Sequence, residues 1–289
     1  MQPITILLAL LAGAPSDPRI PPMLARVSEE AEVFRQMAPK LLAEETLRQR
    51  ARRAPRFRPR AGKAAAKAPP PQYRSREIVS EYTYSSFRES PNLIHEFRQV
   101  ISVDGRKVAT PEKARRTLAL GVTSRDDRLK RQMLEDFERH GLSGAAFDFG
   151  QVILLFTRRR LPDYAFERRG GGRIGADNAV ILAFRQTGGD EALTIFERRK
   201  AIRATLQGEL WVRANDWLPL RIVLLATRKD DDHEVRDEAT VDYVMSSHGA
   251  IVPAAVTRRR FAGQDLIVED VFQYSPFRMF AAEAEIKFQ

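Results

Sequence analysis

The sequence predicts an α+β protein built mainly on a large antiparallel β-sheet. From residue 164 onward, runs of alternating apolar and polar residues follow one another with short connections, as in a meander of antiparallel strands. Helix-like segments lie before this region and no long helix interrupts it, which argues against parallel βαβ units. A chain of 289 residues, 43% of them hydrophobic, can bury a sizeable core beside such a sheet.

The first sixteen residues predict a secretory signal. An apolar run covers residues 4–14, is too short to cross a bilayer, and ends in the small residues Ala12, Gly13 and Ala14. We therefore expect residues 1–16 to be a signal peptide and the mature protein to be periplasmic or secreted. No basic residue precedes the run, and Pro15 lies beside the expected cleavage site. An uncleaved apolar N-terminus is therefore the alternative.

Residues 17–53 are expected to form an N-terminal helix that packs on the main domain. Pro39 should kink this helix or divide it in two, because proline lacks a backbone N–H and its ring clashes with the preceding turn. A coiled-coil seam is the alternative, but the pattern spans few heptads. The prediction rests on apolar residues that recur at steps of three and four: Leu24, Val27, Ala31, Phe34, Ala38 and Leu41.

A basic segment rich in arginine, alanine and proline separates this helix from the main domain. Residues 48–76 contain eleven Lys and Arg and no Asp or Glu, and without them the net charge of +10 would be −1. Residues 54–72 offer few apolar side chains to bury and are expected to be a flexible tether. The charge between Arg52 and Arg76 favours an anionic membrane surface as a partner. Nucleic acid is not an expected partner, because the tether has too few aromatic residues to stack on bases.

Residues 73–289 are predicted to form the main sheet domain. Two strands come first, and Asp104 and Gly105 mark a tight turn after the second. The later strands are expected at residues 179–186, 192–198, 206–214, 218–228, 236–245, 251–261, 265–274 and 283–288.

A helical insertion is expected near residues 110–158, between the early and the late strands. Thr110 followed by Pro111 is typical of a helix N-terminus, and Gly141 is typical of a helix end. Residues 149–156 are expected to form a third helix, although their length also permits a buried strand.

No pattern in the sequence predicts an enzyme, a metal site or a cofactor. The chain has no cysteine, and its four histidines match no recognised spacing of metal ligands. The glycine-rich residues 167–177 lead into a strand rather than a helix, so a turn between strands is expected there instead of a phosphate-binding loop. No Gly-x-Ser-x-Gly nucleophile elbow is present.

Residues 206–228 predict a β-hairpin in the wall of the sheet. Asn215 and Asp216 suit a turn, because their side chains hydrogen-bond to nearby backbone. Pro219 lies near the start of the next strand, where a missing N–H is tolerated. Alternation puts four residues on one face: Leu206, Gly208, Leu210 and Val212.

This hairpin resembles those of the periplasmic lipoprotein-carrier superfamily, which includes outer-membrane lipoprotein carriers, lipoprotein-sorting-like proteins and related envelope-stress regulators. The resembling residues are Gly208-Glu209-Leu210-Trp211-Val212, then Asn215-Asp216, then Leu218-Pro219-Leu220-Arg221-Ile222. The order of elements fits as well, over residues 73–289 and the first helix. The resemblance implies a strongly curved, incomplete β-barrel, with helices on its concave face and an apolar cavity for acyl chains.

The resemblance also implies an exported, non-enzymatic protein that binds a lipid, an acyl chain or another apolar ligand. The alternatives are an envelope protein-interaction or sensor module without a small ligand, and an undetected hydrolase. Alternation and helical periodicity predict the residues that would line the cavity, although the same residues would suit a packed core. They are Val180, Leu182, Phe184, Leu210, Val212, Leu220, Ile222, Leu224, Met133 and Phe137.

Overall fold

One large antiparallel sheet and three α-helices make up the part of the chain that the computed structural model describes. The described residues are 17–53, 70–142, 148–189, 195–197, 200–202, 206–230 and 233–280. The expected signal peptide, most of the expected tether and the expected strand at residues 283–288 lie outside them. The predicted α+β class and the large antiparallel sheet are confirmed.

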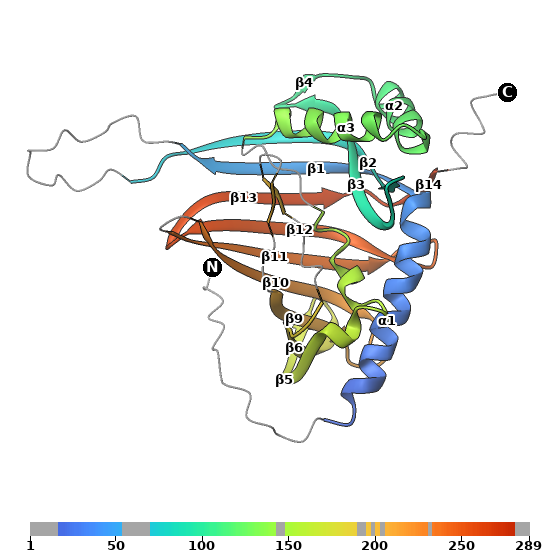
Figure 1. The fold of residues 1–289 in the computed structure, drawn as a ribbon, viewed down its shortest axis with the longest axis vertical. Helices are drawn as coiled ribbons and strands as arrows, with labels where there is room; N and C mark the ends of the chain where they lie inside the picture. The colour runs from blue at the N-terminus through green and yellow to red at the C-terminus, as the bar shows by residue number, and fades with distance from the viewer. Residues whose placement is uncertain are drawn as a thin grey trace, which may run out of the picture.

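The sheet has twelve strands and is open. Its order is β4-β3-β2-β1-β13-β12-β11-β10-β9-β6-β5, with β14 paired to the start of β1, and no pairing among the described strands joins β4 to β5. Figure 1 shows the strand direction turning along the sheet, from strands seen at full length around β1 to foreshortened strands around β5, as in a curved sheet. The strands are β1 (Leu41–Arg52), β2 (Tyr73–Phe87), β3 (Ser90–Val103), β4 (Arg106–Lys107), β5 (Tyr164–Ile174), β6 (Asp177–Gln186), β9 (Leu206–Arg213), β10 (Pro219–Asp230), β11 (His233–Met245), β12 (Ile251–Ala262), β13 (Asp265–Tyr274) and β14 (Arg278–Met279), and β7 (Ile195–Glu197) pairs separately with β8 (Lys200–Ile202).

The helices lie against two parts of the sheet. Helix α1 runs across the strand directions (Figure 1) and contacts β12, β5 and the 3-10 helix η2. Helices α2 and α3 pack on β2 and β3. The predicted cap is confirmed, because the Lys113 backbone N–H donates to Thr110 Oγ1 at 3.2 Å. The bounds are α1 (Ile20–Met37), η1 (Ala38–Lys40), α2 (Pro111–Thr123), α3 (Asp127–His140), η2 (Val152–Phe156) and η3 (Leu161–Asp163).

The second half of the expected helix at residues 17–53 is a strand, and this part of the prediction was wrong. Helix α1 ends at Met37, and β1 begins at Leu41 after the short turn η1, which contains Pro39. β1 pairs with β2 on one side and with β13 on the other. Its leucine, alanine and glutamate residues favour a helix, but two strand neighbours outweigh that weak local preference.

The predicted hairpin at residues 206–228 is confirmed as β9 and β10. Leu210 pairs with Ile222, and Trp217 lies in the connecting segment at φ 59°. Only glycine fits at residue 208 without a steric clash, because a Cβ built there would lie 1.9 Å from the carbonyl oxygen of Val223. Glycine at this position therefore allows β10 its close approach to β9.

Two other local predictions need correction. Residues 149–156 contain the five-residue 3-10 helix η2 rather than a full α-helix. The glycine-rich residues 170–172, expected in a turn, continue β5, and the turn follows at residues 175–176. A Cβ built at Gly172 would lie 2.4 Å from the ring of Trp211 on β9, so glycine in this part of β5 makes room for that ring.

Strand β5 forms one edge of the sheet. Among the described strands it pairs with β6 alone, and the register shifts between Arg168 and Gly170. Gly170 has φ 141°, a conformation that few residues other than glycine adopt. The outward part of this edge carries the exposed side chains of Arg168, Arg169 and Arg173.

The main core lies between one face of the sheet, α1 and η2. Phe34 and Tyr84 pack edge to face with ring centroids 5.3 Å apart, and Phe156 packs on Phe184 at 5.1 Å. A second, smaller cluster lies where α2 and α3 meet β1 and β3. Its buried members are Leu42, Phe87, Phe97, Leu118 and Met133.

Candidate functional site

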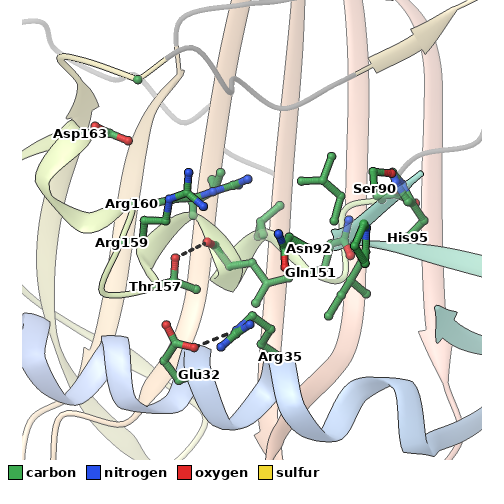
Figure 2. A pocket seen from close by; sticks show the side chains of 18 of the residues that line it. Glu32, Arg35, Ser90, Asn92, His95, Gln151, Thr157, Arg159, Arg160 and Asp163 are labelled. Atoms are coloured by element: carbon green, nitrogen blue, oxygen red, sulfur yellow. Dashed lines mark hydrogen bonds and ion pairs between the residues drawn. The ribbon is translucent and has the colours of Figure 1, made fainter. Parts of the chain in front are cut away.

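An open cleft of about 1060 Å³ lies beside η2. Its walls come from α1, from residues 89–95 around the β2–β3 turn, from residues between 148 and 164, and from Gly189. Figure 2 shows the order of the labelled side chains across it: Asp163, then Arg160 and Arg159, then Gln151 and Asn92, then His95 and Ser90, with Glu32 and Arg35 of α1 along one side. The cleft therefore joins three segments that are far apart in the sequence.

Both apolar and polar groups line the cleft. η2 has a hydrophobic sequence, Val-Ile-Leu-Leu-Phe, and its short 3-10 turns direct these side chains to more than one side. Phe156 faces the sheet, where it packs on Tyr164 and Phe184, whereas other residues of η2 face the cleft. The apolar side chains that line the cleft are Leu93, Ile94, Val152, Leu154, Leu155 and Tyr164.

Three carboxylates that line the cleft already have a hydrogen-bond or ion-pair partner. Glu32 accepts from Arg35 at 2.8 Å within α1. Glu89 accepts from Arg131 of α3 at 2.6 Å. Asp148 bonds to His95, as described next. These pairs are partly exposed and add little stability, but they leave few free negative charges in the cleft.

Asp148 and His95 form a hydrogen-bonded pair at the wall of the cleft. Asp148 Oδ2 lies 2.7 Å from His95 Nδ1, and Asp148 Oδ1 accepts the Glu96 backbone N–H at 3.0 Å. A carboxylate that orients a histidine is half of the arrangement used for general acid–base chemistry. It is also a common way to fix a loop to a strand. The pair is the observation closest to the hydrolase alternative.

The segment that begins at Asp148 is anchored to the sheet by buried polar groups. The Gly150 N–H donates to Glu96 Oε1 at 2.6 Å, and Tyr243 Oη donates to the Gly150 carbonyl at 3.1 Å. Tyr243 Oη also accepts the Ile153 N–H at 3.1 Å. Glycine is required here, because a Cβ at residue 150 would lie 2.7 Å from Glu96 Oε1 and about as close to two tyrosine hydroxyls. The start of η2 is thus held in one position.

Glu96 is a buried carboxyl surrounded by titratable groups. Burial raises its pKa to about 8, against the opposing effect of Arg98. Arg98 Nη2 donates to Glu96 Oε2 at 2.6 Å, and the same guanidinium donates to both oxygens of Glu45. Burial also raises the pKa values of Tyr82 and Tyr84 beside it, so both remain neutral hydroxyls at ordinary pH.

A second set of buried charges continues across the strands. Arg258 on β12 donates to Asp270 on β13 and to Asp237 on β11, at 2.9 Å in both cases. Arg260 donates to Asp237 at 2.9 Å, and Gln49 on β1 donates to Asp270 at 2.8 Å. Burial opposes the charge on Asp237, but Arg258 and Arg260 outweigh it and lower the pKa of that carboxyl. We refer to Glu45, Glu96, Arg98, Asp237, Arg258, Arg260 and Asp270 as the buried charge network.

The ten predicted cavity residues lie mainly in the packed core rather than around the cleft. Val180 is partly buried, and Met133 lies in the second cluster, apart from Phe137 in the main one. Leu220 is buried at the register shift in β10. None of the ten is among the described residues that line the cleft. Six strand residues share the main core: Leu182, Phe184, Leu210, Val212, Ile222 and Leu224.

Sequence reasoning missed the residues that form the cleft. The isolated apolar sequence of η2 followed by three arginines, Arg158 to Arg160, was the available signal, because an apolar run beside clustered positive charge suits an amphiphile. The buried charge network had no local signal, since its partners lie on strands far apart in the chain.

Two further observations concern metals and membranes. Within the described part of the chain, no three His, Asp or Glu side chains lie together in a way that could hold a metal ion. Among the described helices, none combines the length and the apolar character needed to cross a membrane.

Comparison with known proteins returns distant structural neighbours. No family model matches the chain, and no curated protein matches it. A DUF1329 family protein from Desulfovibrio piger has 12% identity and a TM-score of 0.32, over 89% of this chain and 92% of its own. A domain from Vibrio parahaemolyticus, described as an outer membrane lipoprotein-sorting protein, has 9% identity and a TM-score of 0.35, over 89% of this chain and 91% of its own.

The description of the second neighbour names a group that the β9–β10 hairpin resembles in sequence. Because both TM-scores are low, the similarity carries no argument about ligand or function. The description of the fold given above therefore depends on the strand order and register of this chain alone.

Proposed function

We propose that this chain is an exported, non-enzymatic protein that binds an acyl chain or a similar apolar ligand in the cleft beside η2. The observation that supports the proposal is the cleft itself, with about 1060 Å³ of space and an apolar wall from η2 and the β2–β3 turn. Ligand sites are usually concave, largely apolar and of roughly 300–1,000 Å³. The exposed Leu93 at its rim, with 38% of its surface accessible, extends the apolar wall outward.

The predicted cavity on the inner face of β6, β9 and β10 remains a second proposed location. There the side chains pack under Phe156, so a ligand would have to displace η2 to reach them. The anchoring of Gly150 and Ile153 by Glu96 and Tyr243 opposes that displacement. The cleft needs no such movement and is therefore the preferred location.

The test is the binding of an environment-sensitive fatty-acid probe, with the melting temperature recorded on the same samples. Leu154→Trp fills the cleft and should weaken binding roughly tenfold, about 1.4 kcal/mol. Leu120→Trp, on an α2 position that is 60% exposed and outside the cleft, is the matched control and should change neither quantity. Val212→Phe probes the inner face and should lower stability by about 1–3 kcal/mol through overpacking.

Selective loss of binding in Leu154→Trp places the ligand in the cleft, and selective loss in Val212→Phe places it on the inner face. A wild-type protein that binds no acyl probe at micromolar concentration contradicts the proposed function.

A membrane-surface role is a second proposal, supported by a basic pocket. Arg76, Arg106, Lys107 and His140 line a smaller pocket of about 430 Å³ beside the β1–β2 end of the sheet, which projects beyond the other strands in Figure 1. Asp104 lines it as well and pairs with Arg76 at 3.4 Å, which leaves Arg106 and Lys107 as the main source of positive charge. Clustered positive charge attracts anionic lipid headgroups. Binding to anionic vesicles should weaken when both Arg106 and Lys107 are changed to glutamine, and unchanged binding would exclude this surface.

Export is tested separately. Fractionation followed by N-terminal sequencing should find a mature chain that begins between Pro15 and Pro18. Protein that remains in the cytoplasm and still carries Met1 would contradict export.

A further inference from the structure

Arg159 is a cation in the cleft without a protein partner in the described part of the chain. It lines the cleft and is exposed, and it follows η2 in a turn where the Arg160 and Leu161 N–H groups both donate to the Thr157 carbonyl. Figure 2 shows it projecting beside Arg160 on the same side of the cleft. Arg158 is the adjacent residue, so the local potential is positive.

The carboxylates of the cleft do not neutralise Arg159. Glu32 and Glu89 bond to other arginines, and Asp148 bonds to His95. The fourth, Asp163, lies against Gly189, where its Oδ2 is 2.6 Å from the position of a built Cβ. An anionic group in the cleft would therefore meet a guanidinium that is free to bind it.

Gln151, the residue before η2, supplies a second unsatisfied group next to the arginines in the order across the cleft (Figure 2). Its side-chain oxygen Oε1 is buried and has no hydrogen-bond donor in the described structure. A buried acceptor without a donor costs free energy, which a ligand N–H or O–H would recover. Figure 2 places Gln151 between the arginines and His95, within the same cleft.

We propose that the ligand of this cleft is an anionic amphiphile of the N-acyl amino acid class. This inference rests on the proposed function and deepens it by naming the headgroup. The acyl chain lies on the wall formed by Val152, Leu154 and Leu155, Arg159 binds the carboxylate, and Gln151 Oε1 accepts the amide N–H. No single simpler class matches all three features: a fatty acid lacks the donor, and a neutral amide lacks the charge.

Three matched probes test the headgroup by isothermal titration calorimetry below their micelle concentrations. N-dodecanoylglycine has the chain, the amide N–H and the carboxylate. N-dodecanoylglycinamide removes the charge, and N-dodecanoylsarcosine replaces the N–H with N-methyl. For the wild-type chain we expect the glycine conjugate to bind about tenfold more tightly than the glycinamide, which loses a hydrogen bond to a charged group. We expect it to bind roughly fivefold more tightly than the sarcosine derivative, which loses a hydrogen bond between neutral groups.

Two variants assign the contacts. Arg159→Gln should remove the preference for N-dodecanoylglycine over the glycinamide and leave the preference over the sarcosine derivative. Gln151→Met should do the reverse. Arg158→Gln, an exposed neighbour that does not line the cleft, is the matched control and should retain both preferences.

Equal affinity of the wild-type chain for all three probes overturns the headgroup assignment and leaves acyl-chain binding intact. Absence of binding for every probe overturns both the assignment and the proposed function. A preference that persists in Arg159→Gln or Gln151→Met overturns the role given to that residue.

Discussion

Two parts of the same sheet face are equally buried but are held together by different forces. Around β6, β9 and β10 the inward side chains are aliphatic or aromatic, and Leu182, Leu210 and Ile222 have no exposed surface. Around β1, β3 and β11 to β13 the same face carries the buried charge network, in which Arg258 and Glu96 are also fully buried. Packing in the first part is non-directional, whereas the second part depends on specific partners. The comparison teaches that burial alone does not say how a region responds to mutation.

The difference between the two parts can be tested by placing methionine at one buried position in each of them, Arg258 and Leu210. Arg258→Met removes a buried charge while keeping similar volume, and it leaves Asp270 with the neutral Gln49 as its remaining donor. Loss of one partner from a buried ion pair costs about 3–5 kcal/mol, so we expect a loss of that size in the free energy of unfolding. Chemical denaturation measures it.

The neighbouring arginine provides the control for this change. Arg259 faces the other side of β12, is partly exposed, and bonds to Glu269 at 2.6 Å. Arg259→Met should cost at most about 1 kcal/mol, as is usual for a surface pair. Equal effects of the two substitutions would contradict the distinction between the regions.

The apolar part should respond to volume rather than to partner identity. Leu210→Ala is expected to lower the free energy of unfolding by about 2–5 kcal/mol through lost contacts and a new cavity. Leu210→Met keeps the volume and should cost less than about 1.5 kcal/mol, well below Arg258→Met. If Leu210→Met proves as costly as Leu210→Ala, shape rather than burial determines stability on this face.

A dependence on pH is expected to belong to the charged part alone. The pKa of Glu96 is raised from 4.5 to about 8 by burial, so the folded state binds a proton that the unfolded state has lost. Its contribution to stability is complete below about pH 4.5 and disappears as the pH rises through about 8. Glu96→Gln does not titrate, and the variant should therefore gain stability relative to the wild type over this range.

The measurement is the difference in unfolding free energy between Glu96→Gln and the wild type at several pH values. The groups that face Glu96 are present in both proteins and cancel to first order: Arg98, Glu45, Asp148, Tyr82 and Tyr84. A flat difference for Glu96→Gln would show that this carboxyl is ionised throughout.

The sequence predicted the apolar part of the sheet better than the charged part. Alternation placed Leu206, Leu210 and Val212 on the inner face, because a period of two residues is a local property of a strand. The residue types of Thr110 and Pro111 were also sufficient to predict the N-terminal cap of α2. The hairpin turn before Pro219 followed from residue types that favour turns.

The remaining features depend on contacts between distant segments. β1 has a helix-like composition and becomes a strand because β2 and β13 flank it. Its buried Glu45 interrupts the apolar alternation, and its partner Arg98 lies on β3. The cleft combines α1, the β2–β3 turn and η2, so its residues share no pattern in the sequence.

The edge strand β5 has a consequence for how copies of the protein behave at high concentration. An exposed strand edge can template pairing with another chain, which leads to aggregation. Here the register shift at Gly170 interrupts the ladder, and Arg168, Arg169 and Arg173 surround it. Arg168 and Arg169 pair with Asp17 and Glu167, so like-charge repulsion between two copies is reduced there. Two copies that met edge to edge would still have to pair along an irregular backbone, so the interrupted ladder is the main feature that opposes self-association at this end of the open sheet.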